Sequence, residues 1–269
     1  MALLFLIFMV TTRSVMSIST QSSRVIILVK ALPQPSKQYG ETVCCAGITA
    51  GGSWKRLYPV RFRHLQGSQS FSRWDWVNFK FRDPTRDKRV ESCHVFEETI
   101  QIDGKFPAGQ RPGFFNRLIY GSAQHASEQG LSLALIRPRN TRFSCKPKSA
   151  EEVEGEREIY RIAAQQESFF DQKLAELEPS PYRFRFSFED DSGRHTYQDG
   201  DWETHAMFFN QRERTNEQDA LRWMSEVFNE RYPRKGMVFA IGNMAKRPQT
   251  WQLLGVIRLD ENKQGELGL

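Results

Sequence analysis

Two short β-type runs joined by glycines constrain the fold of this chain most. Residues 42–48 lead through Gly51 and Gly52 into residues 54–62. Runs of this length with glycines between them predict a β-hairpin. The second run alternates aromatic or apolar residues with cations, and flat aromatic faces beside cations are the combination that binders of single-stranded nucleic acid use.

Further short β-type runs surround this hairpin. Residues 25–29 form a continuous apolar run rich in β-branched residues, which predicts a buried strand. Along residues 71–81, apolar and polar side chains tend to alternate, and turn residues follow. Residues 90–96 form another candidate strand. Many short strands separated by glycine and proline turns, with few helices, predict a small β-barrel or a sandwich.

The C-terminal half mixes helices with strands. Ser149, followed three residues later by Glu152, forms a capping box that predicts a charged helix over 150–175. The other predicted elements are a short helix at 121–130, helices at 202–211 and 216–231, and strands at 131–136, 182–188, 237–241 and 251–259. The predicted fold class is therefore α+β, with an N-terminal small β-barrel followed by a mixed α/β C-terminal unit.

The chain divides into four predicted segments. They are a leader at 1–15, a β-barrel domain at 16–148, a charged linker helix at 149–178 and an α/β domain at 179–269. The apolar run at 2–10 in the leader is too short to span a bilayer, so we expect no membrane partner. We expect the leader to be disordered or to derive from an upstream start, with a membrane tether as the alternative.

Charge is distributed unevenly along the sequence. Residues 54–148 hold 18 Lys and Arg against 8 Asp and Glu, whereas residues 149–178 hold 3 against 9. A basic region followed by an acidic segment indicates a surface that faces a polyanion and a solvated linker helix. The alternative is a mildly basic protein that does not touch nucleic acid.

The four cysteines, Cys44, Cys45, Cys93 and Cys145, contain no CxxC pair. Neighbouring cysteines alternate between the two faces of a strand and do not easily bridge to each other. This spacing favours reduced thiols in a cytoplasmic protein over a disulfide framework or a structural zinc site.

Three sequence blocks resemble a known group of proteins. They are VIILVKALPQPSKQYGETVCCAGITAGGSWKRLYPVRFR at 25–63, SLALIRPRN at 132–140, and DWE at 201–203 with FAIGN and WQLLGVI further on. The chain resembles bacterial proteins with OB-like or dual-OB domains that are associated with mobile elements and phage defence. The resemblance implies an OB-like barrel and a nucleic-acid-binding role in antiviral defence in a prokaryote. The turn at 189–195 has no cysteine, unlike a related turn in those proteins, so their metal knuckle is not expected here.

The candidate nucleic-acid-binding residues come from two basic clusters. They are Trp54, Lys55, Arg56, Tyr58, Arg61, Arg63, Trp74, Lys80, Arg137 and Arg139. Aromatic rings would stack on bases, worth about 1–3 kcal/mol for each base, and cations would neutralise phosphates. The second cluster continues into Arg142, Lys146 and Lys148. The alternative for the aromatic residues is the barrel core, and for the cations a solvated surface.

One group of titratable residues could be catalytic. His195, Asp201 and Glu203 are the candidate catalytic residues, with Asp199 and His205 beside them. Asp201 and Glu203 would hold Mg²⁺ or Mn²⁺ if the protein is a nuclease, because hard divalent cations prefer carboxylate ligands. The alternative is structural, with Asp201 as the N-cap of a helix and Glu203 in its first turn.

These patterns favour a protein that binds DNA or RNA through a basic, aromatic β-surface. A metal-dependent nuclease is the first alternative. The second is an interaction subunit whose partner is encoded by a neighbouring gene.

Overall fold

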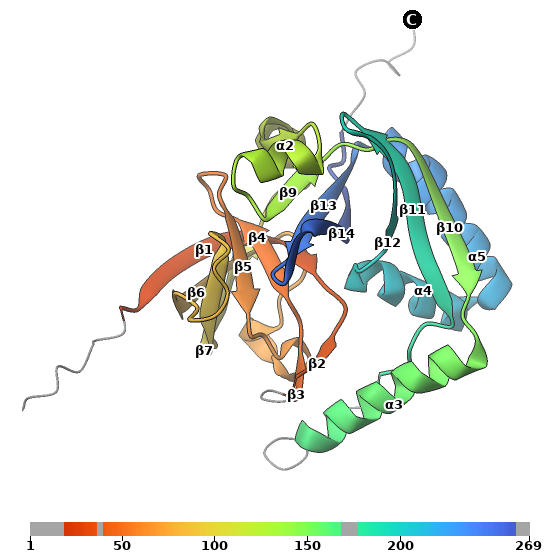
Figure 1. The fold of residues 1–269 in the computed structure, drawn as a ribbon, viewed down its shortest axis with the longest axis horizontal. Coiled ribbons are helices and arrows are strands. Elements are labelled where there is room, and N and C mark those ends of the chain that lie inside the picture. Colours follow the sequence, from red (N-terminus) through yellow and green to blue (C-terminus); the bar gives the residue numbers. More distant parts are fainter. Residues whose placement is uncertain (1–18, 37–39, 168–176, 262–269) are drawn as a thin grey trace, which may run out of the picture.

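The computed structural model describes residues 19–36, 40–167 and 177–261. The leader at 1–15 and the end of the predicted linker helix, 168–176, lie outside the described residues. The chain forms a mixed α/β structure with a strand-rich N-terminal sheet and a C-terminal α/β part. Figure 1 shows three layers, which are the N-terminal sheet, a central sheet, and an outer sheet with its helices.

The N-terminal sheet contains five strands. They are β1 (Gln21–Lys30), β4 (Cys45–Ile48), β5 (Trp54–Tyr58), β6 (Asp75–Arg82) and β7 (Ser92–Lys105). β1 pairs antiparallel with both β4 and β6, so the hydrogen-bonded order β1-β4-β5-β7-β6 returns to its start. β5 and β7 are the one parallel pair in this sheet. The predicted hairpin is confirmed as β4 and β5, although its second strand ends at Tyr58.

Apolar side chains that alternate along these strands fill the inside of the N-terminal sheet. Val25 and Ile27 of β1, Leu57 of β5 and Phe79 and Phe81 of β6 belong to one buried cluster. The alternation at 71–81 reflects this period of two, although β6 begins only at Asp75. The run at 25–29 is continuously apolar because Ile26 and Leu28, on the other face of β1, are buried in a second cluster.

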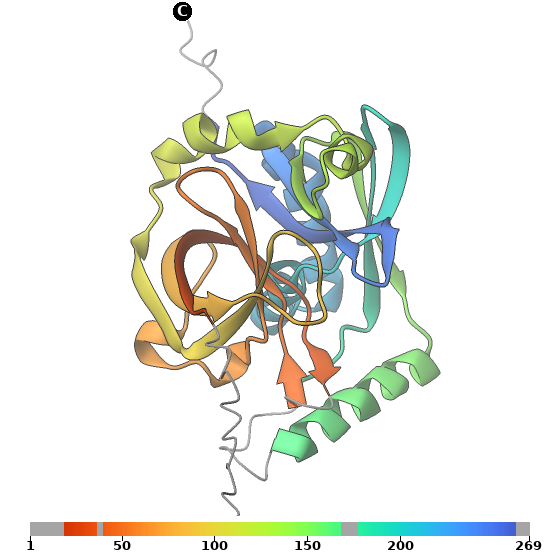
Figure 2. The ribbon, with the colours of Figure 1, turned by 60° about the vertical axis from the view of Figure 1, so that its left-hand side comes forward.

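Two sheets make up most of the C-terminal part. The central sheet has the order β14-β13-β9-β8, built from β8 (Ile119–Tyr120), β9 (Leu133–Ile136), β13 (Met237–Met244) and β14 (Arg247–Arg258). The outer sheet is antiparallel and consists of β10 (Arg139–Pro147), β11 (Tyr182–Asp190) and β12 (Gly193–Gln198). A short hairpin, β2 (Gln34–Ser36) with β3 (Gly40–Thr42), projects from the N-terminal part (Figure 2).

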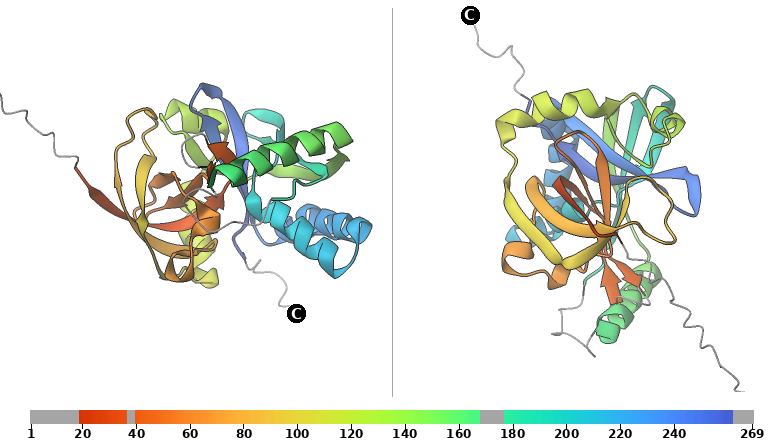
Figure 3. Two further views of the ribbon diagram at one scale, coloured as in Figure 1. Left: turned by 90° about the horizontal axis from the view of Figure 1, so that it is seen from below. Right: turned by 90° about the vertical axis from the view of Figure 1, so that its left-hand side faces the viewer.

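Four of the six described α-helices contact strands of the C-terminal sheets. The α-helices are α1 (Arg111–Phe115), α2 (Ala123–Glu128), α3 (Ala150–Glu167), α4 (Trp202–Arg214), α5 (Glu217–Glu226) and α6 (Tyr232–Arg234), with a π-helical turn at Val227–Arg231 between the last two. Ser149 and Glu152 exchange the two predicted hydrogen bonds at the start of α3, so the capping box is confirmed. In Figure 3 (left), α3 reaches from the C-terminal part towards the β2–β3 hairpin, and α4 and α5 lie side by side.

The strand pairing differs from the predicted domain boundary at residue 148. β9 pairs with β13, and β10 pairs with β11, so residues 119–147 share their sheets with the C-terminal strands. The N-terminal sheet ends at Lys105. The sequence placed the boundary in the acidic stretch because charge changes there, but strand partners are decided by contacts between distant segments.

A second buried cluster joins the N-terminal sheet to the central sheet. Ile48 of β4, Trp54 of β5, Leu133 of β9, Val238 of β13 and Ile257 of β14 all belong to it. A third cluster lies between the central sheet, the outer sheet, α4 and α5. The outward face of the β4–β5 hairpin is therefore an internal interface of the molecule.

Candidate functional site

The predicted nucleic-acid face of the hairpin is buried at its centre. Trp54 is 7% exposed and Arg56 is 4% exposed, because the central sheet covers them. Arg56 donates from Nη2 to the carbonyl oxygen of Ser132 at 3.1 Å and to its Oγ at 3.2 Å. Neither Trp54 nor Arg56 is accessible to a base or a phosphate in this structure, which corrects the interpretation of these two residues.

A buried carboxylate completes the contact around Arg56. Glu91 accepts hydrogen bonds from the backbone nitrogen of Ser132 at 2.7 Å and from its Oγ at 2.6 Å. Ser132 thus lies between a buried cation and a buried anion. These hydrogen bonds hold β9 against β5. Arg56 Nε is the one side-chain polar atom of this contact that has no hydrogen-bond partner within the described residues.

The other members of the predicted set do not share one face. Trp74 is buried against Phe115 and lies under the guanidinium of Arg111. Lys55 lies over the ring of Phe81, and Tyr58 is 42% exposed.

The predicted cations also differ in their surroundings. Arg61 pairs with Glu97 at 2.9 Å, and Arg63 is half-buried, whereas Lys80 is exposed. Arg137 pairs with Glu261 at 2.7 Å, and Arg139 pairs with Asp191 at 2.7 Å.

The candidate nuclease residues have separate structural partners. His195 Nε2 lies 2.8 Å from Asp190 Oδ1 on the β11–β12 hairpin, and Glu203 pairs with Lys30 at 2.5 Å. Asp201 is fully buried and forms two 2.8 Å hydrogen bonds with Arg73. Among the residues that the structure describes, no group of three His, Cys, Asp or Glu side chains could hold a metal ion.

Asp201 instead connects three parts of the fold, which are the segment of Arg73, the start of α4, and β14. Its Oδ1 accepts from the backbone nitrogen of Glu203 at 3.1 Å, which caps α4, and its Oδ2 accepts from the nitrogen of Val256 at 2.9 Å. The structural alternative predicted for this residue is the one that the geometry supports.

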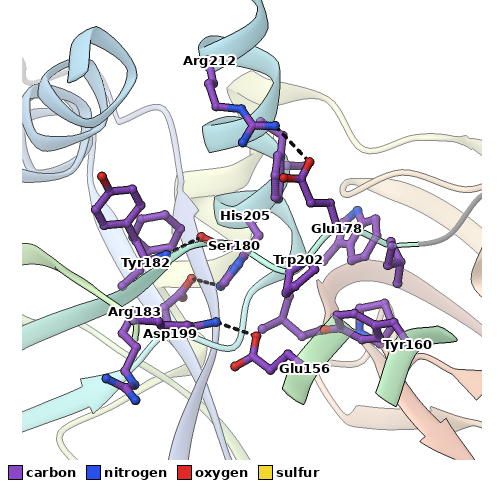
Figure 4. A pocket seen from close by; sticks show the side chains of 18 of the residues that line it. Glu156, Tyr160, Glu178, Ser180, Tyr182, Arg183, Asp199, Trp202, His205 and Arg212 are labelled. Atoms are coloured by element: carbon purple, nitrogen blue, oxygen red, sulfur yellow. Dashed lines mark hydrogen bonds and ion pairs between the residues drawn. The ribbon is translucent and has the colours of Figure 1, made fainter. Parts of the chain in front are cut away.

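A cavity of about 590 Å³ lies between α3, α4 and the start of β11 (Figure 4). Its aromatic lining comes from Tyr160, Tyr182, Phe184, Trp202 and Phe209. Its charged lining comes from Lys148, Glu156, Glu178, Arg183, Asp199, His205, Arg212 and Glu213. The sequence signalled Asp199 and His205 only as neighbours of the candidate nuclease residues.

Asp199 and His205 form an incompletely bonded pair in this cavity. Asp199 Oδ2 and His205 Nε2 are 3.9 Å apart, and neither atom has a hydrogen-bond partner within the described part of the chain. Burial, together with the negative charge of Asp201, raises the pKa of Asp199 well above its ordinary value. Burial and the nearby charge of Lys148 lower the pKa of His205 to about 4. Both effects favour an uncharged pair.

We expect the imidazole of His205 to stay neutral down to a pH of about 4. Between pH 6.5 and 4 the unfolded chain binds this proton and the folded chain does not, so this group makes the protein less stable as the pH falls through that window. NMR titration of the imidazole carbon signals measures the pKa directly, with the urea-unfolded chain as the reference. A midpoint near 6.5 in the folded protein would contradict this assignment.

A second candidate surface is the exposed face of the outer sheet. Its outward residues include Arg142, Ser144 and Lys146 of β10, Arg183, Arg185, Ser187 and Glu189 of β11, and Arg194, Thr196 and Gln198 of β12, and we call it the basic sheet face. The inward residues of the same strands, such as Phe143 and Phe186, are buried. Alternation therefore places the cations together on one side.

Three cations of the basic sheet face have no counterion among the residues that the structure describes. Arg142, Lys146 and Arg185 make no ion pair or side-chain hydrogen bond with any described residue, whereas Arg183 pairs with Glu152 and Arg194 with Glu189. Arg142 and Lys146 belong to the second basic cluster of the sequence, and the structure places both on strand β10.

Comparison with known proteins identifies two families along the chain. Residues 115–267 match the family described as Domain of unknown function (DUF8757). Residues 21–112 match Domain of unknown function (DUF8758). No curated protein matches the chain. The boundary between the two matches lies close to α1, which supports a division of the chain before β8.

Proposed function

We propose that this chain, which belongs to the DUF8757 family, binds nucleic acid through the basic sheet face. The observation that carries the proposal is the group of three unpaired cations, Arg142, Lys146 and Arg185, on one side of an antiparallel sheet. Surface cations without counterions attract phosphates. When Lys and Arg neutralise the phosphates, the counterions condensed on the nucleic acid are released, which favours binding.

The spacing of these cations suits a repeating polyanion. Arg185 lies opposite Ser144, so it stands on the sheet level between Arg142 and Lys146. Residues two apart on a strand are about 7 Å from each other. The three side chains therefore form a stepped row in which each step could contact a successive phosphate. Ser144, Ser187 and Thr196 supply hydroxyl groups between them.

The face offers phosphate contacts more than base recognition. Its outward residues include no aromatic ring on which a base could stack, because Phe143, Phe184 and Phe186 point inward. Phosphate contacts position a strand but carry no sequence information. The proposed binding is therefore expected to depend weakly on sequence.

We also infer that the N-terminal sheet is OB-like. Five strands that close on themselves, with a parallel pair between the third and the fifth, support this inference. OB-folds commonly bind oligonucleotides on the face of their second and third strands. In this chain those strands are β4 and β5, and the central sheet covers them. This is the physical reason for proposing the outer sheet instead.

The affinity for single-stranded DNA or RNA is expected to fall steeply with salt. Three phosphate contacts give a logarithmic slope of about −2, so raising the salt from about 50 to 200 mM should weaken binding by about 20-fold. Fluorescence anisotropy of labelled oligonucleotides, without divalent metal, measures this. No binding to single-stranded or duplex DNA or RNA at low salt would contradict the proposal.

A further inference from the structure

We propose that the cavity between α3, α4 and β11 binds an uncharged planar heterocycle of the nucleobase class, with its polar edge against Asp199 and His205. The site shares no unpaired cation with the basic sheet face, so it goes beyond the proposed function. The walls, the polar end and the charge balance of the cavity each carry part of the argument.

Two buried polar atoms at one end of the cavity have no hydrogen-bond partner among the described residues. Asp199 is 2% exposed, and its Oδ2 and the Nε2 of His205 are without hydrogen bonds among the described residues. Their separation of 3.9 Å is too long for a direct hydrogen bond but lets one polar atom lie about 2.8 Å from both. Buried polar groups are costly unless they are bonded, so this end of the cavity favours a ligand with a hydrogen-bonding edge.

The walls suit a flat ring. In Figure 4, Tyr182 lies on one side of Asp199 and His205, and Trp202 and Tyr160 lie on the other. Trp202 and Tyr160 are half-buried, so part of each side chain remains accessible. The volume of about 590 Å³ is within the usual range of pockets for small molecules and exceeds the needs of one nucleobase with its sugar.

The charge balance argues against recognition of a phosphate here. Lys148 pairs with Glu156 at 2.6 Å, Arg212 with Glu178 at 3.1 Å, and Arg183 with Glu152. The exposed Glu213 is the one charged lining residue that forms no ion pair with a described residue. A phosphate would meet cations that are already neutralised and a free carboxylate. We therefore expect a nucleoside to bind at least as well as its 5′-triphosphate.

Isothermal titration calorimetry of the full chain with adenosine, guanosine, cytidine and uridine, and with their 5′-triphosphates, tests the inference. We expect one nucleoside at least to bind, and Asp199→Asn to weaken it by tenfold or more. Ala206→Phe, which narrows the cavity from α4 without changing the polar pair, should abolish binding. Circular dichroism and thermal unfolding show that each variant is folded.

Two outcomes would overturn the inference. One is that no nucleoside binds the wild-type chain at millimolar concentration, and the other is that both folded variants bind as tightly as the wild type. Failure of the proposed function is a separate result, because Arg185→Glu should weaken an oligonucleotide and leave nucleoside binding unchanged. If Asp199→Asn also weakens an oligonucleotide, the bound base comes from a strand, and if it does not, the ligand is a free nucleoside.

Discussion

Replacing Asp201 with Asn is expected to lower the free energy of unfolding by about 3–5 kcal/mol. The substitution keeps the size of the side chain and its capping oxygen, but it leaves the guanidinium of Arg73 buried without its counterion. That guanidinium has a side-chain exposure of only 13%, and both hydrogen bonds from its Nη2 go to Asp201. Urea unfolding followed by tryptophan fluorescence measures the change.

The matched control is the double variant Arg73→Met with Asp201→Asn. Removing both charges removes the unpaired ion, so the double variant should recover part of the lost stability. A single variant whose unfolding free energy stays within about 1 kcal/mol of the wild type would contradict the structural role assigned to Asp201.

The second large effect is expected at Arg56. Arg56→Met removes the donor to the carbonyl and hydroxyl oxygens of Ser132 and leaves the buried carboxylate of Glu91 without a nearby cation on the other side of Ser132. We expect a loss of about 3 kcal/mol in the free energy of unfolding and no change in the affinity of the folded protein for nucleic acid.

Lys55 provides a neighbouring control on the same strand. Its side chain points away from the central sheet and lies over Phe81 at 5.0 Å. Lys55→Met should therefore cost about 1 kcal/mol or less. If Arg56→Met kept full stability and reduced binding, the hairpin would be a nucleic-acid face as its sequence suggested.

The hairpin shows what the sequence could and could not predict. Its two strands follow from local alternation and from the glycines between them, and both are present. Which face is covered depends on Leu133, Val238 and Ile257, which lie far along the chain. Arginine is almost never fully buried unless it is paired, so an exposed cationic face was the natural expectation for Arg56.

The basic sheet face and the cavity were also only partly predictable from the sequence. The alternation of Phe184 and Phe186 with Arg183 and Arg185 predicted a half-buried strand correctly. The basic sheet face arises only because β10 pairs beside that strand, and its partner could not be deduced from one sequence. The cavity is harder still, since its lining comes from Leu32 to Glu213 and depends on how α3 and α4 pack.

Within the described ranges, no helix combines the length and the apolar character needed to cross a bilayer. The apolar leader lies outside those ranges.

The four cysteines are free thiols, with Cys45 and Cys93 buried.

The most direct test of the proposed binding surface compares two charge-reversed variants of equal net charge. One carries Glu at Arg142, Lys146 and Arg185, and the other carries Glu at Lys80, Arg86 and Lys88, which are exposed on the N-terminal part. Fluorescence anisotropy with the same single-stranded oligonucleotide should show at least tenfold weaker binding and a shallower salt dependence for the first variant. The second should stay within about threefold of the wild type, because long-range charge effects are screened at physiological salt. Equal losses in both variants, or a larger loss in the second, would contradict binding through the basic sheet face.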